Sequence, residues 1–129
     1  MKLSIIVCVY NEINTIEAIL KKIDEVVLPS PYSKEIIIID NNSNDGTKEF
    51  LKKLIPKNKY KIIFQEKNLG KGNSVITGIN EASGTLTVFQ DADLEYEPKN
   101  FVRLINHLSE YNLDAVFGSR IKSLLKTKS

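Results

Sequence analysis

Residues 3–9 read LSIIVCV, and the three residues that follow, Tyr10, Asn11 and Glu12, are polar. A run this short, rich in β-branched residues and without in-out alternation, predicts a strand that is buried on both faces. Apolar residues at helical spacing follow at once, over residues 13–27. This order of strand and then helix is the first half of an α/β unit.

The rest of the chain repeats this order. Further short apolar runs lie at residues 36–39, 60–64, 86–89 and 115–117, and helical spacing recurs at 47–54, 75–82 and 101–108. The apolar residues at helical spacing are Ile13, Ile16, Leu20, Ile23 and Val27, then Phe50, Leu51 and Leu54, then Val75, Ile76, Ile79 and Ala82, and last Phe101, Leu104, Ile105 and Leu108. Asp45 is the expected cap of the second helix. The sequence therefore predicts an α/β fold with a mainly parallel sheet and helices on both faces.

Composition limits the classes of protein that fit. The 129 residues are enough for one domain, and 18 basic against 16 acidic residues give a net charge of +2, which does not predict a nucleic-acid partner. The lone cysteine, Cys8, can form no internal disulfide, so we expect a buried core thiol in a reducing, cytoplasmic compartment. No apolar stretch reaches the roughly 18 residues of a membrane span, so any membrane association is expected to be peripheral.

Ligands of open α/β sheets bind outside the carboxyl ends of the strands, so the polar residues after each apolar run are the first candidates for a site. These clusters are Tyr10-Asn11-Glu12, Asp40-Asn41-Asn42, Asn68-Leu69-Gly70-Lys71-Gly72, Asp91-Ala92-Asp93 and Gly118-Ser119-Arg120.

Asp91 and Asp93 place two carboxylates at a strand end with only Ala92 between them. Such a pair suits Mg²⁺ or Mn²⁺, which completes its shell with water and substrate phosphate oxygens, and Glu95 could supply a third ligand. The structural alternative is a solvated turn that caps the helix expected near Pro98.

Three further residues fit a nucleotide ligand. Asp40 ends the second strand, where nucleotide-binding sheets often place an acid that accepts hydrogen bonds from a ribose or base. Lys71, between Gly70 and Gly72, is either a phosphate contact or a solvated lysine at a glycine-rich helix entry. Arg120 is either a group that neutralises diphosphate charge or a surface arginine.

Several other site types are absent from the sequence. It contains neither a phosphate-binding P-loop nor a Gly-x-Gly-x-x-Gly fingerprint after the first strand. It also has no His/Cys cluster for zinc and no Gly-x-Ser-x-Gly elbow, and we interpret His107 as structural or exposed.

Together, residues 4–12, 39–47, 68–72 and 90–96 resemble, in order and spacing, the family 2 glycosyltransferases of GT-A fold. The run at 91–95 and the Gly-Ser-Arg ending look most like polyprenyl-phosphate (dolichyl-phosphate) mannose and glucose synthases. The resemblance implies transfer of a hexose from GDP-mannose or UDP-glucose to a polyprenyl phosphate at a membrane surface, with inversion at the anomeric carbon.

The resemblance also implies roles for residues. Tyr10 and Glu12 would contact the nucleotide, Asp40 the base or ribose, and Arg120 the phosphates. The predicted catalytic residues are Asp91, Asp93 and Arg120, the predicted metal ligands are Asp91, Asp93 and Glu95, and the predicted substrate-binding residues are Tyr10, Asn11, Glu12, Asp40, Lys71, Gln90, Asp91 and Ala92. Asn41 and Asn42 depart from the Asp-Gly that is common in this family, which weakens the expectation of base contacts.

We expect a nucleotide-sugar-binding domain over residues 1–120 and a basic tail over 121–129, with the acceptor-binding half that normally follows Gly-Ser-Arg missing. One alternative is a non-catalytic module that keeps the donor pocket. A phosphotransferase or phosphatase with an Asp-x-Asp pair is a second alternative, but it needs a nucleophilic Asp after the first strand, where this chain has Tyr10-Asn11-Glu12.

Overall fold

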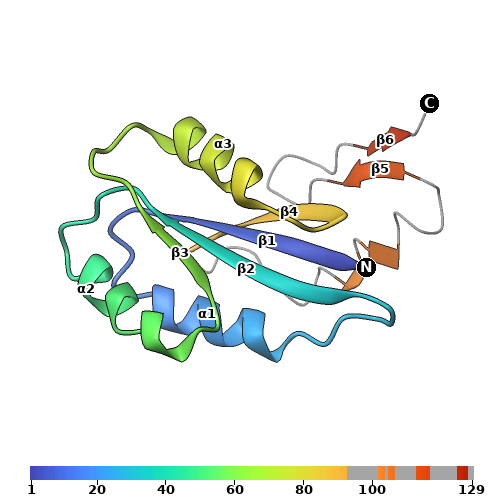
Figure 1. Ribbon diagram of the computed structural model, residues 1–129, viewed down its shortest axis with the longest axis horizontal. Coiled ribbons are helices and arrows are strands. Elements are labelled where there is room, and N and C mark those ends of the chain that lie inside the picture. The colour runs from blue at the N-terminus through green and yellow to red at the C-terminus, as the bar shows by residue number, and fades with distance from the viewer. Residues whose placement is uncertain (93–101, 104, 107–112, 117–124, 128–129) are drawn as a thin grey trace.

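A parallel sheet of four strands in the order β3-β2-β1-β4 forms the centre of the molecule (Figure 1). The computed structural model describes residues 1–92, 102–103, 105–106, 113–116 and 125–127. The strands are β1 (Lys2–Val9), β2 (Ser33–Asp40), β3 (Lys61–Phe64) and β4 (Leu86–Asp91). All four form at the predicted apolar runs, and the prediction of a mainly parallel sheet is confirmed.

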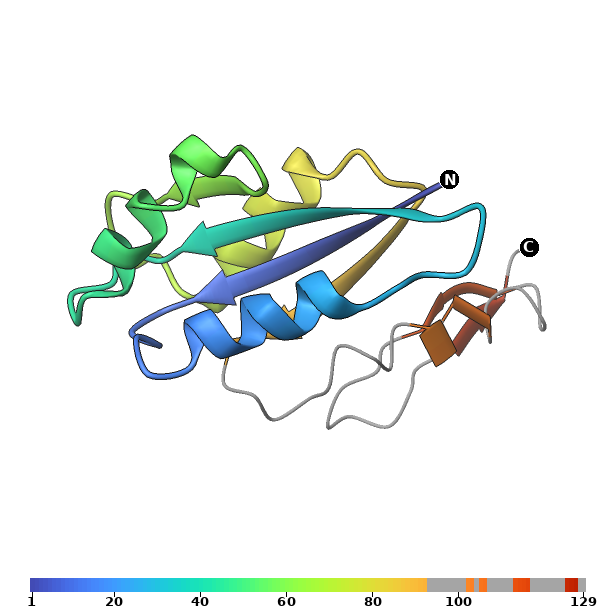
Figure 2. The ribbon, with the colours of Figure 1, turned by 90° about the horizontal axis from the view of Figure 1, so that it is seen from below.

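Helices cover both faces of this sheet. They are α1 (Ile16–Glu25), α2 (Thr47–Lys52), the one-turn 3-10 helix η1 (Ile55–Lys57) and α3 (Lys71–Glu81). Figures 1 and 2 show α1 and α2 on one face and α3 on the other. Alternation along β1 accounts for the two layers, since Leu3, Ile5 and Val7 pack in the cluster with α1, whereas Ile6 packs in the cluster on the other face.

Helix α1 packs through a stripe of four buried residues, Ile16, Ile19, Leu20 and Ile23. The predicted stripe is wrong at both ends, because Ile13 precedes the helix and is 36% exposed, and Val27 follows it and is 84% exposed. The helix ends where the Lys34 ammonium donates hydrogen bonds to three backbone carbonyls, those of Ile23 (2.6 Å), Asp24 (2.8 Å) and Val26 (2.7 Å). The Ile23 carbonyl also accepts from the Val26 amide at 3.2 Å, so the cation adds to the hydrogen bonding at the helix end.

Helix α3 packs on the sheet through small residues instead of the predicted apolar stripe. Ser74 and Gly78 are buried, whereas Ile76 and Ile79 are 60% and 50% exposed. A Cβ atom at Gly78 would lie 2.5 Å from Cγ2 of Ile6, so the helix backbone approaches β1 too closely for any side chain. The predicted stripe is wrong at Ile76 and Ile79, because close packing selects small residues, which hydrophobic periodicity overlooks. It is confirmed at Ala82, which follows the helix and packs against the core.

Helix α2 packs inward through the predicted residues, with Leu51 buried and Phe50 and Leu54 partly buried against the core. Its cap position is Gly46, with φ +107°, and not Asp45 as predicted. The Asp45 carboxylate still accepts a hydrogen bond from the Thr47 amide at 3.0 Å, so it satisfies a donor of the first turn from one position further out.

Beyond β4 the structure describes short pieces. Residues 102–103 and 105–106 are helical, and Ile105 is 2% exposed within the core cluster. Phe101, Leu104, His107 and Leu108 lie outside the described residues. The fifth apolar run gives β5 (Leu113–Val116), which pairs antiparallel with β6 (Leu125–Thr127), inside the predicted tail, instead of joining the parallel sheet. None of the helices in the described part is long and apolar enough to span a bilayer.

Candidate functional site

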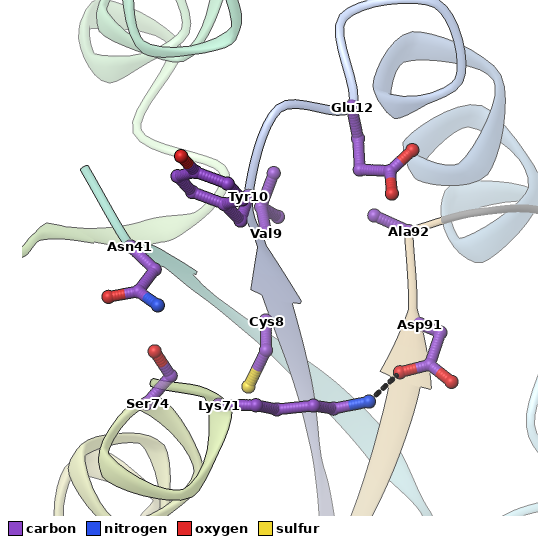
Figure 3. Close-up of a pocket in the computed structure, with 9 residues that line it drawn as sticks. All are labelled: Cys8, Val9, Tyr10, Glu12, Asn41, Lys71, Ser74, Asp91 and Ala92. Atoms are coloured by element: carbon purple, nitrogen blue, oxygen red, sulfur yellow. Dashed lines mark hydrogen bonds and ion pairs between the residues drawn. The ribbon is translucent and has the colours of Figure 1, made fainter. Parts of the chain in front are cut away.

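A pocket of about 200 Å³ opens at the carboxyl ends of β1 and β4 (Figure 3). Its lining residues are Cys8, Val9, Tyr10, Glu12, Asn41, Lys71, Ser74, Asp91 and Ala92. The parallel register places Cys8 of β1 beside Asp91 of β4, and α3 brings Lys71 and Ser74 to the same place. The pocket therefore lies where open α/β sheets bind ligands.

An ion pair lies inside this pocket. The Lys71 ammonium is 2.6 Å from Oδ1 of Asp91, and the two side chains are 66% and 25% exposed (Figure 3). Lys71 is the first residue of α3 and follows Gly70, whose φ of +88° requires glycine. Gly70 thus makes the predicted tight turn, whereas Gly72 belongs to the helix.

The loop after β1 is fixed beside this ion pair. The Glu12 carboxylate accepts a hydrogen bond from Oγ1 of Thr15 at 3.0 Å, and the same hydroxyl contacts the carbonyl oxygen of Ala92. The amide of Glu12 donates to Oγ1 of Thr47 at 3.0 Å. The Tyr10 side chain, by contrast, is 44% exposed, so its ring is available to a ligand.

Asn41 lines the pocket, although it is not among the predicted substrate-binding residues. Its Nδ2 donates to Oδ1 of Asn68 at 2.8 Å, and its Oδ1 accepts from the Leu69 amide at 3.1 Å. The side chain therefore ties the end of β2 to the loop that carries Lys71. Its position directly after β2 is the signal that could have identified it in the sequence as a pocket residue.

Three predicted substrate-binding residues do not line this pocket. Asp40 is fully buried, and its carboxylate accepts hydrogen bonds from the hydroxyl (2.6 Å) and amide (3.1 Å) of Ser43. Asn11 lies at φ +52° and pairs its side-chain amide with Asn44, while Gln90 is 3% exposed. Their contacts are those of turns and packing, and a role in substrate binding stays a prediction.

Cys8 lies in the pocket wall, partly buried, and it also packs against the core cluster of Ile6, Ile37 and Ile39, so the prediction of a core thiol is confirmed in part. Burial raises its pKa to about 11, with the Lys71 ammonium lowering the pKa and the Asp91 carboxylate raising it. The side chain is therefore a neutral thiol at neutral pH, and an unreactive one.

Of the predicted metal ligands, only Asp91 lies in the described part of the chain. Asp93 and Glu95 fall outside it, as does Arg120. Within the described residues, no three His, Cys, Asp or Glu side chains gather closely enough to hold an ion. The Asp91 carboxylate is of the oxygen type that Mg²⁺ and Mn²⁺ accept, so it fits one position of such a site.

Comparison with known proteins identifies relatives of this chain. The chain is 36% identical over 120 residues to the dolichol-phosphate mannosyltransferase of Pyrococcus furiosus. The aligned region covers 93% of this chain and 33% of that protein. It is 34% identical over 115 residues to the cholesterol galactosyltransferase of Borreliella burgdorferi, over 89% of this chain and 31% of that protein. The chain thus spans about a third of the length of these relatives.

A solved structure supports the fold. The mannosyltransferase PcManGT from Pyrobaculum calidifontis, in complex with GDP-Man and Mn²⁺, has a TM-score of 0.72 at 25% identity, over 83% of this chain and 32% of that chain. The model of the family described as "Glycosyl transferase family 2" matches residues 4–129. Since this match covers nearly the whole chain, and its fold is similar to that of the solved neighbour, the chain belongs to glycosyltransferase family 2 and has the GT-A fold.

Proposed function

We propose that the pocket binds a nucleoside diphosphate sugar, GDP-mannose or UDP-glucose, and that the whole protein transfers the hexose with inversion to a polyprenyl phosphate. The observation that carries the proposal is the Lys71–Asp91 ion pair at the carboxyl ends of β1 and β4. One group of each charge lies where a diphosphate and its counter-ion would meet.

Lys71 is the proposed contact of the diphosphate. Its ammonium is mostly exposed, and it lies on the first turn of α3, where the helix dipole also favours an anion. A phosphate oxygen would replace the Asp91 carboxylate as its partner. Tyr10, with its exposed ring, would meet the nucleotide, and Asn41 would hold the loop that positions Lys71.

Asp91, together with the predicted Asp93 and Glu95, would hold Mg²⁺ or Mn²⁺, and Arg120 would meet the phosphates. When bound, the ion neutralises charge on the departing diphosphate. The solved mannosyltransferase with GDP-Man and Mn²⁺ supports this proposal by likeness. Lys71 pairs with only one of the two carboxylate oxygens of Asp91, so the other oxygen can bind an ion. Because the ion and the diphosphate would share this site, we expect donor and metal to bind together.

The acceptor is the less constrained half of the proposal, since the relatives are named for dolichol phosphate in one case and cholesterol in another. A phosphate acceptor is already ionised near neutral pH and requires no general base, whereas a hydroxyl acceptor requires one. We favour a polyprenyl phosphate because the chain is somewhat more similar to the first relative.

Calorimetry with GDP-mannose and UDP-glucose, with and without Mn²⁺, tests the proposal. One donor should bind, and more tightly with the metal. Lys71→Met should weaken binding about tenfold or more, since a hydrogen bond to a charged group contributes about 1.5–3 kcal/mol. Asp91→Asn should remove the dependence on Mn²⁺.

Lys61→Met is the matched control, because Lys61 forms an ion pair with Glu81 outside the pocket, with side chains exposed to 48% and 40%. It should change affinity less than twofold. A folded sample that binds no sugar nucleotide, or equal losses from both lysine variants, would contradict the proposal. Binding with neither transfer nor sugar release would identify the non-catalytic module instead.

A further inference from the structure

One side of the molecule, residues 48–61, is strongly basic, and we call it the basic edge. It holds six lysines and one glutamate, a net charge of +5, whereas the chain as a whole carries +2 and the remaining residues are therefore net acidic. It comprises α2, η1 and the start of β3, which follow one another along the β3 side of the sheet (Figures 1 and 2).

Five of the six lysines of the basic edge are exposed to solvent, although Lys61 forms an ion pair with Glu81. Lys52, Lys53, Lys57 and Lys59 are all exposed. Lys59 pairs with Asp24 at 3.0 Å, and the Lys52 ammonium lies 5.9 Å from the ring centre of Phe64. Within the described part of the chain, neither Lys53 nor Lys57 has an acidic partner.

An apolar tip lies between these two lysines. Ile55 is 52% exposed in η1, with exposed Pro56 beside it. Buried Leu51 and partly buried Leu54 anchor the preceding turn to the core, so the tip is held outward by packing. Exposed cations that flank an outward apolar group are the pattern of segments that lie in a membrane interface.

We propose that the basic edge docks the protein on the surface of an anionic phospholipid bilayer. Lys52, Lys53 and Lys57 would contact the headgroup phosphates, and Ile55 would enter the interface. Glu49 is the one acidic residue within the edge, while the neighbouring Asp24 is already bonded to Lys59 and to the Tyr60 hydroxyl, and Glu81 forms an ion pair with Lys61. No residue of the edge lines the strand-end pocket, so the surface does not depend on the proposed donor.

Flotation with vesicles of phosphatidylcholine, with and without phosphatidylglycerol, tests this surface. The chain should bind only the anionic vesicles, and less at high salt. Lys53→Glu with Lys57→Glu should lower the partition coefficient at least about 25-fold, since each lysine near an anionic surface contributes about fivefold. Ile55→Ser should weaken the binding that persists at high salt.

The control is Lys2→Glu with Lys67→Glu, which changes the net charge equally but lies outside the basic edge. It should alter binding less than twofold. The proposal is overturned if the folded chain ignores anionic vesicles, if both double variants lose binding equally, or if an RNA oligonucleotide binds through these lysines while vesicles do not. Calorimetry with the sugar nucleotide on the same variants separates this outcome from a failure of the donor pocket.

Discussion

The polar residues at the strand ends form two groups, those that line the pocket and those that stabilise turns. Tyr10, Glu12 and Asp91 could be predicted because each follows or ends an apolar run, and that rule depends only on strand position. Asp40 and Asn41 show where the rule fails. Both end the same strand, yet Asp40 bonds to Ser43 within the turn and Asn41 faces the pocket. Successive strand residues point to opposite sides, so the sequence cannot say which of two polar neighbours faces a ligand.

The burial of Cys8 leads to a prediction about the rate at which its thiol is alkylated. Because burial raises its pKa to about 11, the reactive thiolate is scarce below that pH and its fraction rises as the pH approaches 11. At pH 8, iodoacetamide should alkylate Cys8 roughly a hundredfold more slowly than a free cysteine, whose pKa is about 8.5. Mass spectrometry follows the reaction directly, since the chain has one cysteine.

A bound sugar nucleotide should slow this alkylation further, because Cys8 lines the pocket. Unfolded chain in denaturant, which lacks the pocket, is the reference and should react at the ordinary rate. Reaction of the native protein at that same rate would show that the thiol is neither buried nor shifted.

Among the elements, the strands were predictable because burial on both faces leaves a continuous β-branched run, as in β1 and β2. The face of α3 that packs on the sheet was not. Its backbone approaches β1 at Gly78, and the other buried residue of the helix is Ser74, so small residues replace large side chains on this face. No pattern of apolar residues encodes such a contact, because the partner surface determines it.

The packing of α3 predicts opposite effects for two glycines of the same helix. Gly78→Ala would place a Cβ atom 2.5 Å from Ile6, a fully buried side chain, so the free energy of unfolding should fall by about 1–2 kcal/mol despite the better helix propensity of alanine. At Gly72 no atom lies within 4 Å of the added Cβ, so Gly72→Ala should be neutral or stabilising by up to about 1 kcal/mol.

Urea unfolding followed by circular dichroism measures both changes. Both substitutions are glycine to alanine within α3, where alanine is the better helix former, so a loss of stability at Gly78 alone cannot come from helix propensity. Equal effects of the two substitutions would mean that α3 does not approach β1 as closely as the structure shows.

For the whole molecule, the alternation of strands and helices was enough to predict a parallel sheet, but not the strand order or the antiparallel pairing of β5 and β6. Strand order depends on which strands meet after folding, and residues 2–9 gain their neighbours from positions near 36 and 88. The pocket has the same long-range origin, since its walls come from β1, β2, β4 and α3.

Because the pocket is built from distant segments of the chain, we can predict how ligand binding affects unfolding. A ligand held by segments that far apart binds only the folded sheet, so its binding energy should appear in the unfolding of the whole domain. At a hundred times its Kd, a sugar nucleotide with Mn²⁺ should stabilise the fold by about 2.7 kcal/mol, raising Tm by roughly 10 °C for a domain of this size. Calorimetric scans with donor, with free hexose and with Mn²⁺ alone measure it. Only the complete donor should give the full shift in Tm. In Asp91→Asn, the part of the shift that depends on Mn²⁺ should be lost. A shift of equal size from free hexose would mean that the ligand binds outside this pocket.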